Sequence, residues 1–243
     1  SRADVHGSGV HGNDKDAAEV IAAKAKELGS PAYKVVQAGA KVLGNNKYGI
    51  DFSLEDDYYG DTRFHIPFIA WYQVMNASLA LTTMEVLKDR IPVTMEQLQA
   101  GIANTRWQGR METILPGVIV DGAHNEDGVR RFVETAERFQ KEYPLTLLFS
   151  AVNDKDYQDM IHTICSRIKF RKVVTTEVGG YREVPSAELA EIFCKEGCKE
   201  VGNSDNIEEA FHMAHEAKGE DGMLFCVGSL YLVGEIKTLL LKK

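Results

Sequence analysis

The sequence contains no apolar run that could cross a membrane as a helix. Such a helix needs about 18 or more consecutive apolar residues, and the longest candidate, residues 66–81, is interrupted by Gln73, Asn76 and Ser78. The chain also lacks an excess of positive charge, because 28 Lys and Arg stand against 36 Asp and Glu, a formal net charge of −8. A non-specific nucleic-acid binder needs a basic face. We therefore expect neither a membrane nor a nucleic acid as a partner.

The sequence has few cysteines and no disulfide framework. Of its four cysteines, Cys194 and Cys198 form a C-x3-C pattern without a second pair or a neighbouring histidine, so no metal site is expected there. Cys165 and Cys226 lie in apolar segments and are expected in the core. The N-terminus lacks the apolar segment of a signal peptide. These features predict a reducing, cytoplasmic environment.

Nucleotide-binding loops of the common kinds are also absent. Residues 44–49 have the spacing of a phosphate loop, but Ile50 and Asp51 follow where Lys and Ser or Thr are required. No G-x-G-x-x-G motif follows an expected strand. We therefore expect residues 44–49 to form a hairpin turn, and any phosphate contact must come from elsewhere.

After residue 105 the sequence alternates short apolar segments with helical ones. Strands are expected at 117–120, 146–150, 172–175, 199–201 and 223–227, followed by helices at 126–142, 157–168, 186–194, 206–217 and 230–242. Such alternation implies parallel pairing and predicts an α/β fold, a Rossmann-like open, mostly parallel sheet with flanking helices. The polar segment 104–110 separates a domain of residues 1–105 from one of residues 106–243.

The first 105 residues mix helices and strands without this regularity. Helices are expected at 16–28, 69–88 and 95–102, and strands at 33–36, 48–54 and 63–68. The helix at 69–88 is expected to be largely buried, which would bury Gln73 and Asn76. Buried amides need hydrogen-bond partners. Either a neighbouring helix or the edge of a nucleotide base would supply them.

The run Asp121-Gly122-Ala123-His124-Asn125 ends the strand at 117–120. Open parallel sheets bind ligands at the carboxyl ends of their strands. Asn125 suits the cap of the next helix, whose free N–H groups favour an anion. Asp121 could accept two hydroxyl hydrogen bonds from a ribose. The alternative is that Asp121 and Asn125 only stabilise the turn.

Three further segments are candidates for ligand binding at or beside the same edge of the sheet. Arg110, beside Gly109, could clamp a phosphate with its forked guanidinium, or could be an ordinary surface arginine. In the segment 153–156, Lys155 is the residue best suited to an anion, whereas its aspartates suit a helix cap. Ser229 follows the last strand and also suits a cap.

Taken in order, these motifs resemble a known family. The sequence contains Gln73-x-x-Asn76-Ala77, Trp107-Gln108-Gly109-Arg110-Met111-Glu112, Asp121-Gly122-Ala123-His124-Asn125, Asn153-Asp154-Lys155-Asp156 and Gly228-Ser229-Leu230-Tyr231. This order resembles the C-terminal half of folylpolyglutamate synthase and dihydrofolate synthase, within the Mur ligase superfamily. The resemblance covers nearly the whole chain. It implies ATP-dependent addition of glutamate to a folate through an acyl phosphate, with Mg as the metal.

The resemblance implies a nucleotide site made by three residues. Asn76 matches the helix asparagine that contacts the adenine, Arg110 the arginine that contacts ATP phosphate, and Asp121 the acid that holds the ribose. At the reacting end, we assign His124 and Lys155 to catalysis, and His124, Asn125 and Ser229 to substrate binding. No metal ligand is assigned to this chain.

The sequence also departs from the family pattern. Gln108, Tyr72, Ala70 and Glu126 replace residues that are usually Pro, His, Gly and Pro, although none of these removes a proposed contact. The phosphate loop, the metal ligands and most of the folate site belong to the family's N-terminal ATPase domain, and the sequence contains none of these parts. The resemblance therefore implies that residues 1–105 are the trailing part of that domain, and that the isolated chain cannot turn over ATP.

Two other functions remain open. A Mur-type ligase that adds an amino acid to a cell-wall precursor would share the superfamily, and a comparison of the two substrates would separate it. A non-catalytic nucleotide-binding α/β module would instead be a complete fold without an exposed apolar interface. The oligomeric state is also left open.

Overall fold

The computed structural model describes residues 12–33, 39–46, 48–179 and 183–241. The chain forms two compact units. The first comprises Ser1–Pro67 and Trp71–Thr105, and the second comprises Phe68–Ala70 and Arg106–Lys243. No helix of the described segments has both the length and the apolarity to cross a membrane.

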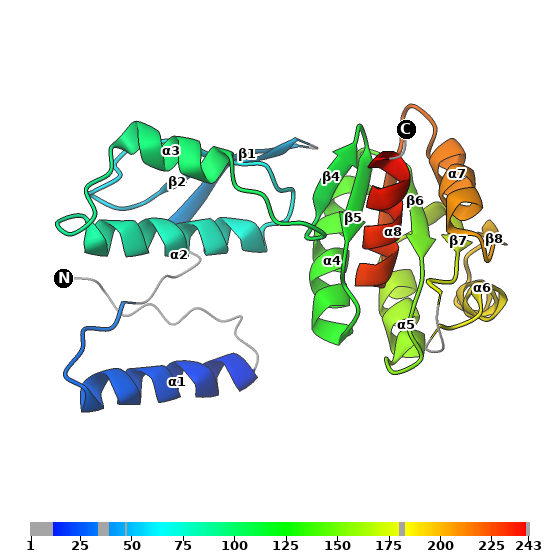
Figure 1. Cartoon of the computed structure of the whole chain (residues 1–243), viewed down its shortest axis with the longest axis horizontal. Coiled ribbons are helices and arrows are strands. Elements are labelled where there is room, and N and C mark those ends of the chain that lie inside the picture. The colour runs from blue at the N-terminus through cyan, green and yellow to red at the C-terminus, as the bar shows by residue number, and fades with distance from the viewer. Residues whose placement is uncertain (1–11, 34–38, 47, 180–182, 242–243) are drawn as a thin grey trace. The chain divides into compact units, whose positions relative to one another are not determined.

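The first unit contains a small antiparallel sheet and three helices (Figure 1). Its strands pair in the order β1-β2-β3, and aromatic side chains pack inside, with the rings of Phe52 and Phe64 5.7 Å apart. The Tyr59 hydroxyl donates to the carbonyl of Leu81 at 2.6 Å, which ties the loop before β3 to a helix. The elements are α1 (Gly12–Glu27), β1 (Ala40–Asn46), β2 (Gly49–Leu54), β3 (Phe64–Ile66), α2 (Tyr72–Leu87) and α3 (Met95–Ala103).

Several expectations for the first unit need correction. The helix expected at 69–88 begins only at Tyr72, because residues 68–70 belong to the second unit in a non-helical conformation. This helix, α2, is not largely buried, since Leu79 is 56% exposed and Asn76 is also exposed. Strand β1 was not expected. The strand expected at 33–36 lies mostly outside the described residues, and the described Tyr33 is not in a strand.

The second unit is built on a six-stranded sheet in the order β4-β5-β9-β6-β7-β8. The edge strand β4 is antiparallel to β5, and all other pairs are parallel. This confirms the mostly parallel α/β fold. The strands are β4 (Glu112–Leu115), β5 (Val118–Asp121), β6 (Leu145–Phe149), β7 (Phe170–Thr175), β8 (Val201–Asn203) and β9 (Met223–Val227). Strand β4 was not expected, and β8 begins two residues later than expected.

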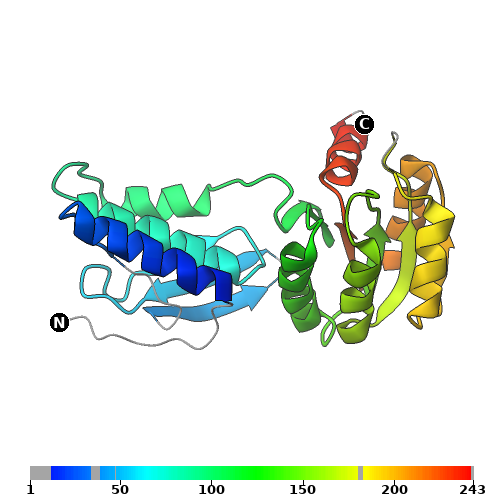
Figure 2. The ribbon, with the colours of Figure 1, turned by 90° about the horizontal axis from the view of Figure 1, so that it is seen from below.

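Helices cover both faces of this sheet (Figure 2). They are α4 (Glu126–Phe139), α5 (Tyr157–Arg167), α6 (Ser186–Lys195), α7 (Ile207–Lys218) and α8 (Leu230–Leu241). Helices α7 and α8 pack on the face formed by Val118, Leu224 and Cys226. The other face packs against α4 and α6 through the ring pairs Phe132–Phe225 and Phe149–Phe193, with centroids 5.5 and 5.4 Å apart. The sheet is therefore buried on both sides, which explains why its central strands are continuous apolar runs.

A tight turn after β9 brings α8 onto its face of the sheet. Gly228 has a φ of +111°, which L side chains rarely adopt, and a Cβ there would lie 2.0 Å from the backbone carbonyl of Ser150. Gly234, within α8, has open space around the position of a Cβ. The same substitution should therefore have opposite consequences at these two glycines.

We predict that Gly228→Ala lowers the free energy of unfolding by about 3 kcal/mol or more, because both the strained φ and the backbone clash oppose it. Gly234→Ala is the matched control. It should be neutral or stabilise by up to about 1 kcal/mol, since alanine favours the helix. Chemical denaturation of the two variants beside the parent protein would measure this, and equal effects would contradict the role given to Gly228.

Candidate active site

The carboxyl ends of the central strands bring three loops to one edge of the sheet. Asp121 pairs in register with Val227, and Val227 pairs with Phe149 on its other side. The segments 122–125, 228–229 and 150–156 therefore begin side by side. Strand β5 continues into α4 on one face, whereas its neighbour β9 continues into α8 on the other. Such a switch in direction opens a crevice where open α/β sheets bind ligands.

Asp121 lies under this edge rather than on it. The residue is only 4% exposed, and its two carboxylate oxygens accept the backbone N–H groups of Met111 and Ala123, both at 2.8 Å. Burial raises the pKa of Asp121 to about 6, although these two hydrogen bonds and the charges of Arg110 and His124 oppose the shift. In this structure the carboxylate joins two turns, and a contact with a ribose stays a proposal.

Arg110 sits in a turn whose backbone is fixed on both sides. Gly109 donates its N–H to Glu112 Oε2 at 2.8 Å, and its carbonyl accepts the N–H of Gly122 at 2.8 Å. On the other side, the N–H of Met111 is held by Asp121. Met111 has a φ of +45°, a region that side-chain-bearing residues seldom occupy. The strained turn is held by its hydrogen bonds and places the half-buried Arg110 beside Asp121.

Sequence reasoning missed the support for this turn. Lys237, in α8, donates to both carboxylate oxygens of Glu112 at 2.7 and 2.9 Å. Both side chains are mostly buried, about a quarter of each being exposed. A lysine 125 residues away in sequence thus holds the carboxylate that holds Gly109. Only the contact between Gly109 and Glu112, which are three residues apart, left a signal in the sequence.

The buried Gly122 and the half-buried His124 lie in the loop next to the Arg110 turn. A Cβ on Gly122 would lie 2.2 Å from Leu230 Cδ2, so a larger residue there would require the Leu230 side chain to move. The Nδ1 of His124 lies 2.7 Å from the carbonyl oxygen of Gly122. A carbonyl only accepts, so Nδ1 carries a proton, and in the neutral form of the ring Nε2 is then the acceptor.

Three of the expected residues are helix caps. Asn125 accepts the N–H of Gly128 at 2.9 Å, Asp156 that of Asp159 at 3.2 Å, and Ser229 that of Tyr231 at 3.1 Å. The capping role expected for each position is confirmed. These contacts fix the start of α4, α5 and α8, and thus the ends of all three loops.

The start of α4 is less suited to an anion than its sequence position suggested. Its first turn carries Glu126 and Asp127, which already oppose the positive end of the helix dipole. Asp127 also accepts from Arg130 and Arg131 at 2.8 and 2.9 Å, contacts that lower its pKa. The positive groups at the edge are therefore side chains: Arg110, and the half-buried Lys155 in the loop after β6.

Asn76 lies in the first unit, on α2, and its surroundings differ from those expected. Its amide donates to Gln73 Oε1 at 2.8 Å, so the two expected residues satisfy one another in part. Gln73 is buried, as expected, and its Nε2 has no partner among the described residues, whereas Asn76 is exposed. An exposed amide is available to a ligand, and the adenine contact stays a proposal.

The described residues contain no preformed cluster of metal ligands. No group of three or more His, Cys, Asp or Glu in the described segments is placed to hold an ion. Magnesium prefers several oxygen ligands in octahedral geometry. No residue described here is therefore assigned to Mg.

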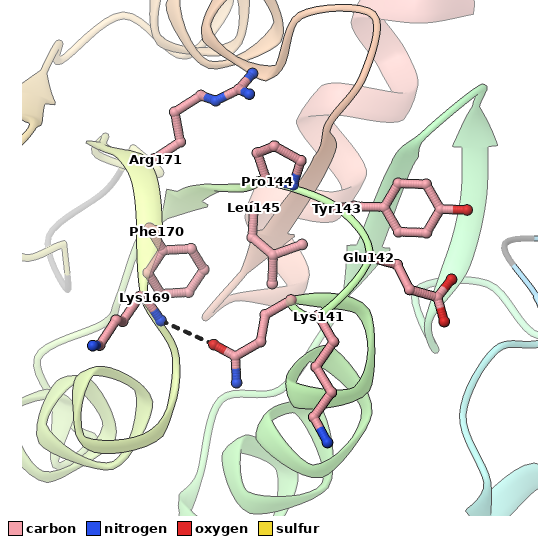
Figure 3. Close-up of a pocket in the computed structure, with 9 residues that line it drawn as sticks. Lys141, Glu142, Tyr143, Pro144, Leu145, Lys169, Phe170 and Arg171 are labelled. Carbon is pink, nitrogen blue, oxygen red and sulfur yellow. Dashed lines mark hydrogen bonds between the residues drawn. The ribbon is translucent and has the colours of Figure 1, made fainter.

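A hollow of about 400 Å³ lies at the other edge of the sheet, at the amino ends of β6 and β7 (Figure 3). Residues 140–145 and 169–171 line it. Arg171 is held by Asp221 through contacts of 3.0 and 2.8 Å, and the backbone N–H of Lys169 donates to Gln140. None of the residues expected to bind ligand lies here, so this hollow is separate from the candidate site.

We predict that the stability advantage of the parent protein over Asp121→Asn shrinks as the pH rises from about 4 to about 6. The folded Asp121 keeps its proton up to about pH 6, whereas the unfolded side chain loses it near pH 4. Its contribution to the free energy of unfolding therefore falls across this window by about 2–3 kcal/mol and is constant above it. Urea unfolding of both proteins at several pH values measures the difference, and a constant difference would contradict the assignment.

Removing the cation beneath Glu112 should loosen the Arg110 turn. We predict that Lys237→Met lowers the free energy of unfolding by about 1–3 kcal/mol, because a mostly buried carboxylate loses its partner. Lys195→Met is the control: its contact with Glu191 spans 3.9 Å between exposed side chains and should contribute less than about 0.5 kcal/mol. A double-mutant cycle with Glu112→Gln isolates the coupling. A coupling near zero would show that Lys237 does not support the turn.

Comparison with known proteins identifies the family to which this chain belongs. Residues 109–230 match the family described as Mur ligase, glutamate ligase domain. The chain is 31% identical over 196 residues to a dihydrofolate synthase/folylpolyglutamate synthase of Bacillus subtilis, across 76% of this chain and 43% of that protein. It is 28% identical over 175 residues to a probable bifunctional folylpolyglutamate synthase/dihydropteroate synthase of Haloferax volcanii, across 71% and 20%.

Solved structures share the fold. A folylpolyglutamate synthase of Thermotoga maritima superposes with a TM-score of 0.74 at 24% identity, over 93% of this chain and 52% of that one. One from Mycobacterium tuberculosis, complexed with ADP and AMPPCP, gives 0.71 at 23% identity, over 91% and 52%. The chain thus spans about half the length of these relatives or less. Because the family match covers half of the chain, the protein belongs to the Mur ligase family and carries its glutamate ligase domain.

Proposed function

We propose that the chain is part of an ATP-dependent ligase that adds glutamate to a folate, and that it supplies the domain facing the nucleotide and the glutamate. The observation that carries this proposal is the strained turn that holds Arg110 beside Asp121 at the switch point of the sheet. Membership in the Mur ligase family supports it. So do the names of the Bacillus subtilis and Thermotoga maritima relatives.

The nucleotide end of the site would use three residues. Arg110 would contact ATP phosphate, because its guanidinium has a planar fork that matches phosphate oxygens and its backbone is fixed on both sides. Asp121 would hold the ribose through the lone pairs that its two backbone contacts leave, and would keep the Arg110 turn in place. Asn76, exposed on α2, would contact the adenine.

The reacting end would use the other residues of the edge. In the proposed mechanism the folate carboxylate is activated as an acyl phosphate, and the amine of glutamate attacks it. Lys155 and Arg110 would stabilise the negative charge that develops on the phosphate. His124, with Nδ1 held by Gly122, would direct Nε2 toward the amine and accept its proton. Asn125 and Ser229 would contact substrate from the caps of α4 and α8.

The length of the chain bears on whether it acts alone. Because the chain matches about half of its relatives or less, we propose that the phosphate loop, the magnesium ligands and most of the folate site lie outside it. On this proposal the isolated chain does not turn over ATP, and its partner is a domain of the ATPase kind. A cell-wall precursor ligase of the same family remains the second candidate, since the family match alone does not separate the two substrates.

The first test is phosphate release from ATP in the presence of Mg, glutamate and a reduced folate. It should compare the chain alone with the gene product that includes any preceding coding sequence. We expect release only from the longer protein, and only when both folate and glutamate are present. Release that depends on a cell-wall precursor instead would favour the second candidate, and release from the chain alone would show that it needs no further domain.

Within the active protein, we predict that Arg110→Ala reduces kcat/KM for ATP by about 10- to 100-fold, the worth of one or two charge-assisted hydrogen bonds. Arg110→Lys should recover only part of this loss, because an ammonium group lacks the planar fork. Arg106→Ala is the control, an exposed arginine four positions earlier, and should change kcat/KM less than about 2-fold. Equal losses in the Arg106 and Arg110 variants would exclude the specific phosphate contact.

A further inference from the structure

Two cysteine thiols face each other on the second unit, away from the three loops of the candidate site. Cys165 lies near the end of α5 and Cys198 lies just past α6, and their Sγ atoms are 3.6 Å apart. Both residues are half-buried. This corrects the expectation that Cys165 is an ordinary core residue, whereas Cys226 is fully buried as expected. Cys194, the other half of the C-x3-C pattern, is exposed on α6.

The end of α6 fixes where Cys198 lies. Gly197 has a φ of +93°, and the N–H of Cys198 donates to the carbonyl of Phe193 at 3.1 Å. This left-handed glycine with a bond back across the last turn is a common way to end a helix. It turns the chain so that Cys198, rather than Cys194, meets α5.

Two polar contacts, both between residues that precede the thiols in sequence, join α5 to α6 and the turn at its end. The Tyr157 hydroxyl donates to Glu188 at 2.7 Å near the beginning of each helix. His162 Nδ1 lies 2.9 Å from Glu196 Oε2 near the end of α6. Because these contacts lie on elements of regular structure, the two thiols are kept close without a rearrangement of the backbone.

The separation suits formation of a covalent bond. A disulfide requires the two sulfurs to approach to about 2.05 Å, which is a shift of roughly 1.5 Å from the observed contact and within the reach of χ1 and χ2 adjustments. The contact also makes the thiols unequal. The hydrogen bond between the two thiols, in which either sulfur can be the donor, lowers the pKa of Cys198, and together with burial it raises the pKa of Cys165. Cys198 is therefore the better nucleophile, since the thiolate is the reactive form.

We propose that Cys165 and Cys198 form a reversible dithiol site, which a low-molecular-weight disulfide oxidises to an intramolecular disulfide joining α5 to the turn after α6. The Cys198 thiolate attacks one sulfur of glutathione disulfide, and one glutathione thiolate leaves. Cys165 loses its proton and attacks the Cys198 sulfur of the mixed disulfide, which releases the second glutathione. In sum, one protein dithiol and one glutathione disulfide give one protein disulfide and two glutathione thiols.

A metal site at the same place has less support. Zinc bound by thiolates takes four ligands in tetrahedral geometry. In the described segments no third His, Cys, Asp or Glu joins the two thiols in a group that could hold an ion. The neighbouring His162 is largely exposed and faces Glu196. The pair is therefore equipped for exchange between thiols and disulfides rather than for metal binding.

The test exposes the folded chain to glutathione disulfide, quenches it in acid, and counts free thiols after denaturation. We expect two of the four thiols per chain, those of Cys165 and Cys198, to be lost without gaining glutathione, and the count to return to four after treatment with dithiothreitol. Peptide mapping should find the segment containing Cys165 linked to the segment containing Cys198. Retention of all four thiols, a linkage through Cys194, or a disulfide between two chains would overturn the proposal.

Serine variants separate the two steps. Cys165→Ser should leave Cys198 carrying one glutathione that is not released, because the resolving thiol is absent. Cys198→Ser should leave Cys165 unmodified over the same time. Cys194→Ser, on α6, is the matched control. This variant should still form the disulfide between Cys165 and Cys198. If Cys165→Ser forms no adduct, or if Cys194→Ser abolishes the disulfide, the assignment of the pair is wrong.

Discussion

The buried carboxylate of Asp121 is the constraint on which the candidate site depends. It accepts one N–H from the turn before β4 and one from the loop after β5, so two segments that are not adjacent in sequence share one anchor. Burying a carboxyl group is costly unless its oxygens are paired, and these two hydrogen bonds together with Arg110 offset part of that cost. The positive φ of Met111 is sustained by the same contact. Without this anchor, the Arg110 turn would be held only on its Gly109 side.

Most of the other expected residues are also engaged in structure. Asn125, Asp156 and Ser229 each accept a backbone N–H at the start of a helix. Substituting them would disturb both the loop and any ligand contact, so a loss of activity in such variants would not by itself identify a ligand. Arg110 and the Nε2 of His124 are different, because the described contacts include no hydrogen bond to either group. Substitutions at these two positions therefore separate an effect on ligand binding or catalysis from an effect on stability better than substitutions at the caps.

The sequence predicted the parts of this protein that depend on local pattern. The alternation of strands and helices after residue 105, the capping positions and the burial of Cys226 all follow from short-range periodicity and residue type. Strand β4 escaped notice because a four-residue edge strand containing Glu112 and Thr113 has little apolar signal. Contacts between segments that are distant in sequence also left no signal in the local pattern. Lys237 under Glu112, and Cys165 facing Cys198, are pairings that only the folded sheet creates.

The placement of β9 between β5 and β6 has a consequence for how the second unit is made. Strands β5 and β6 are successive parallel strands in the chain, yet neither contacts the other in the sheet; each contacts β9, which ends at Val227. On a ribosome, residues 118–149 would emerge well before their common partner exists. The central apolar edges would remain unpaired until the last strand is synthesised, so this sheet closes late and through contacts of long sequence separation. Such topologies fold slowly and expose aggregation-prone edges meanwhile, so the pairing of β9 with β5 and β6 is the step that closes the centre of this sheet.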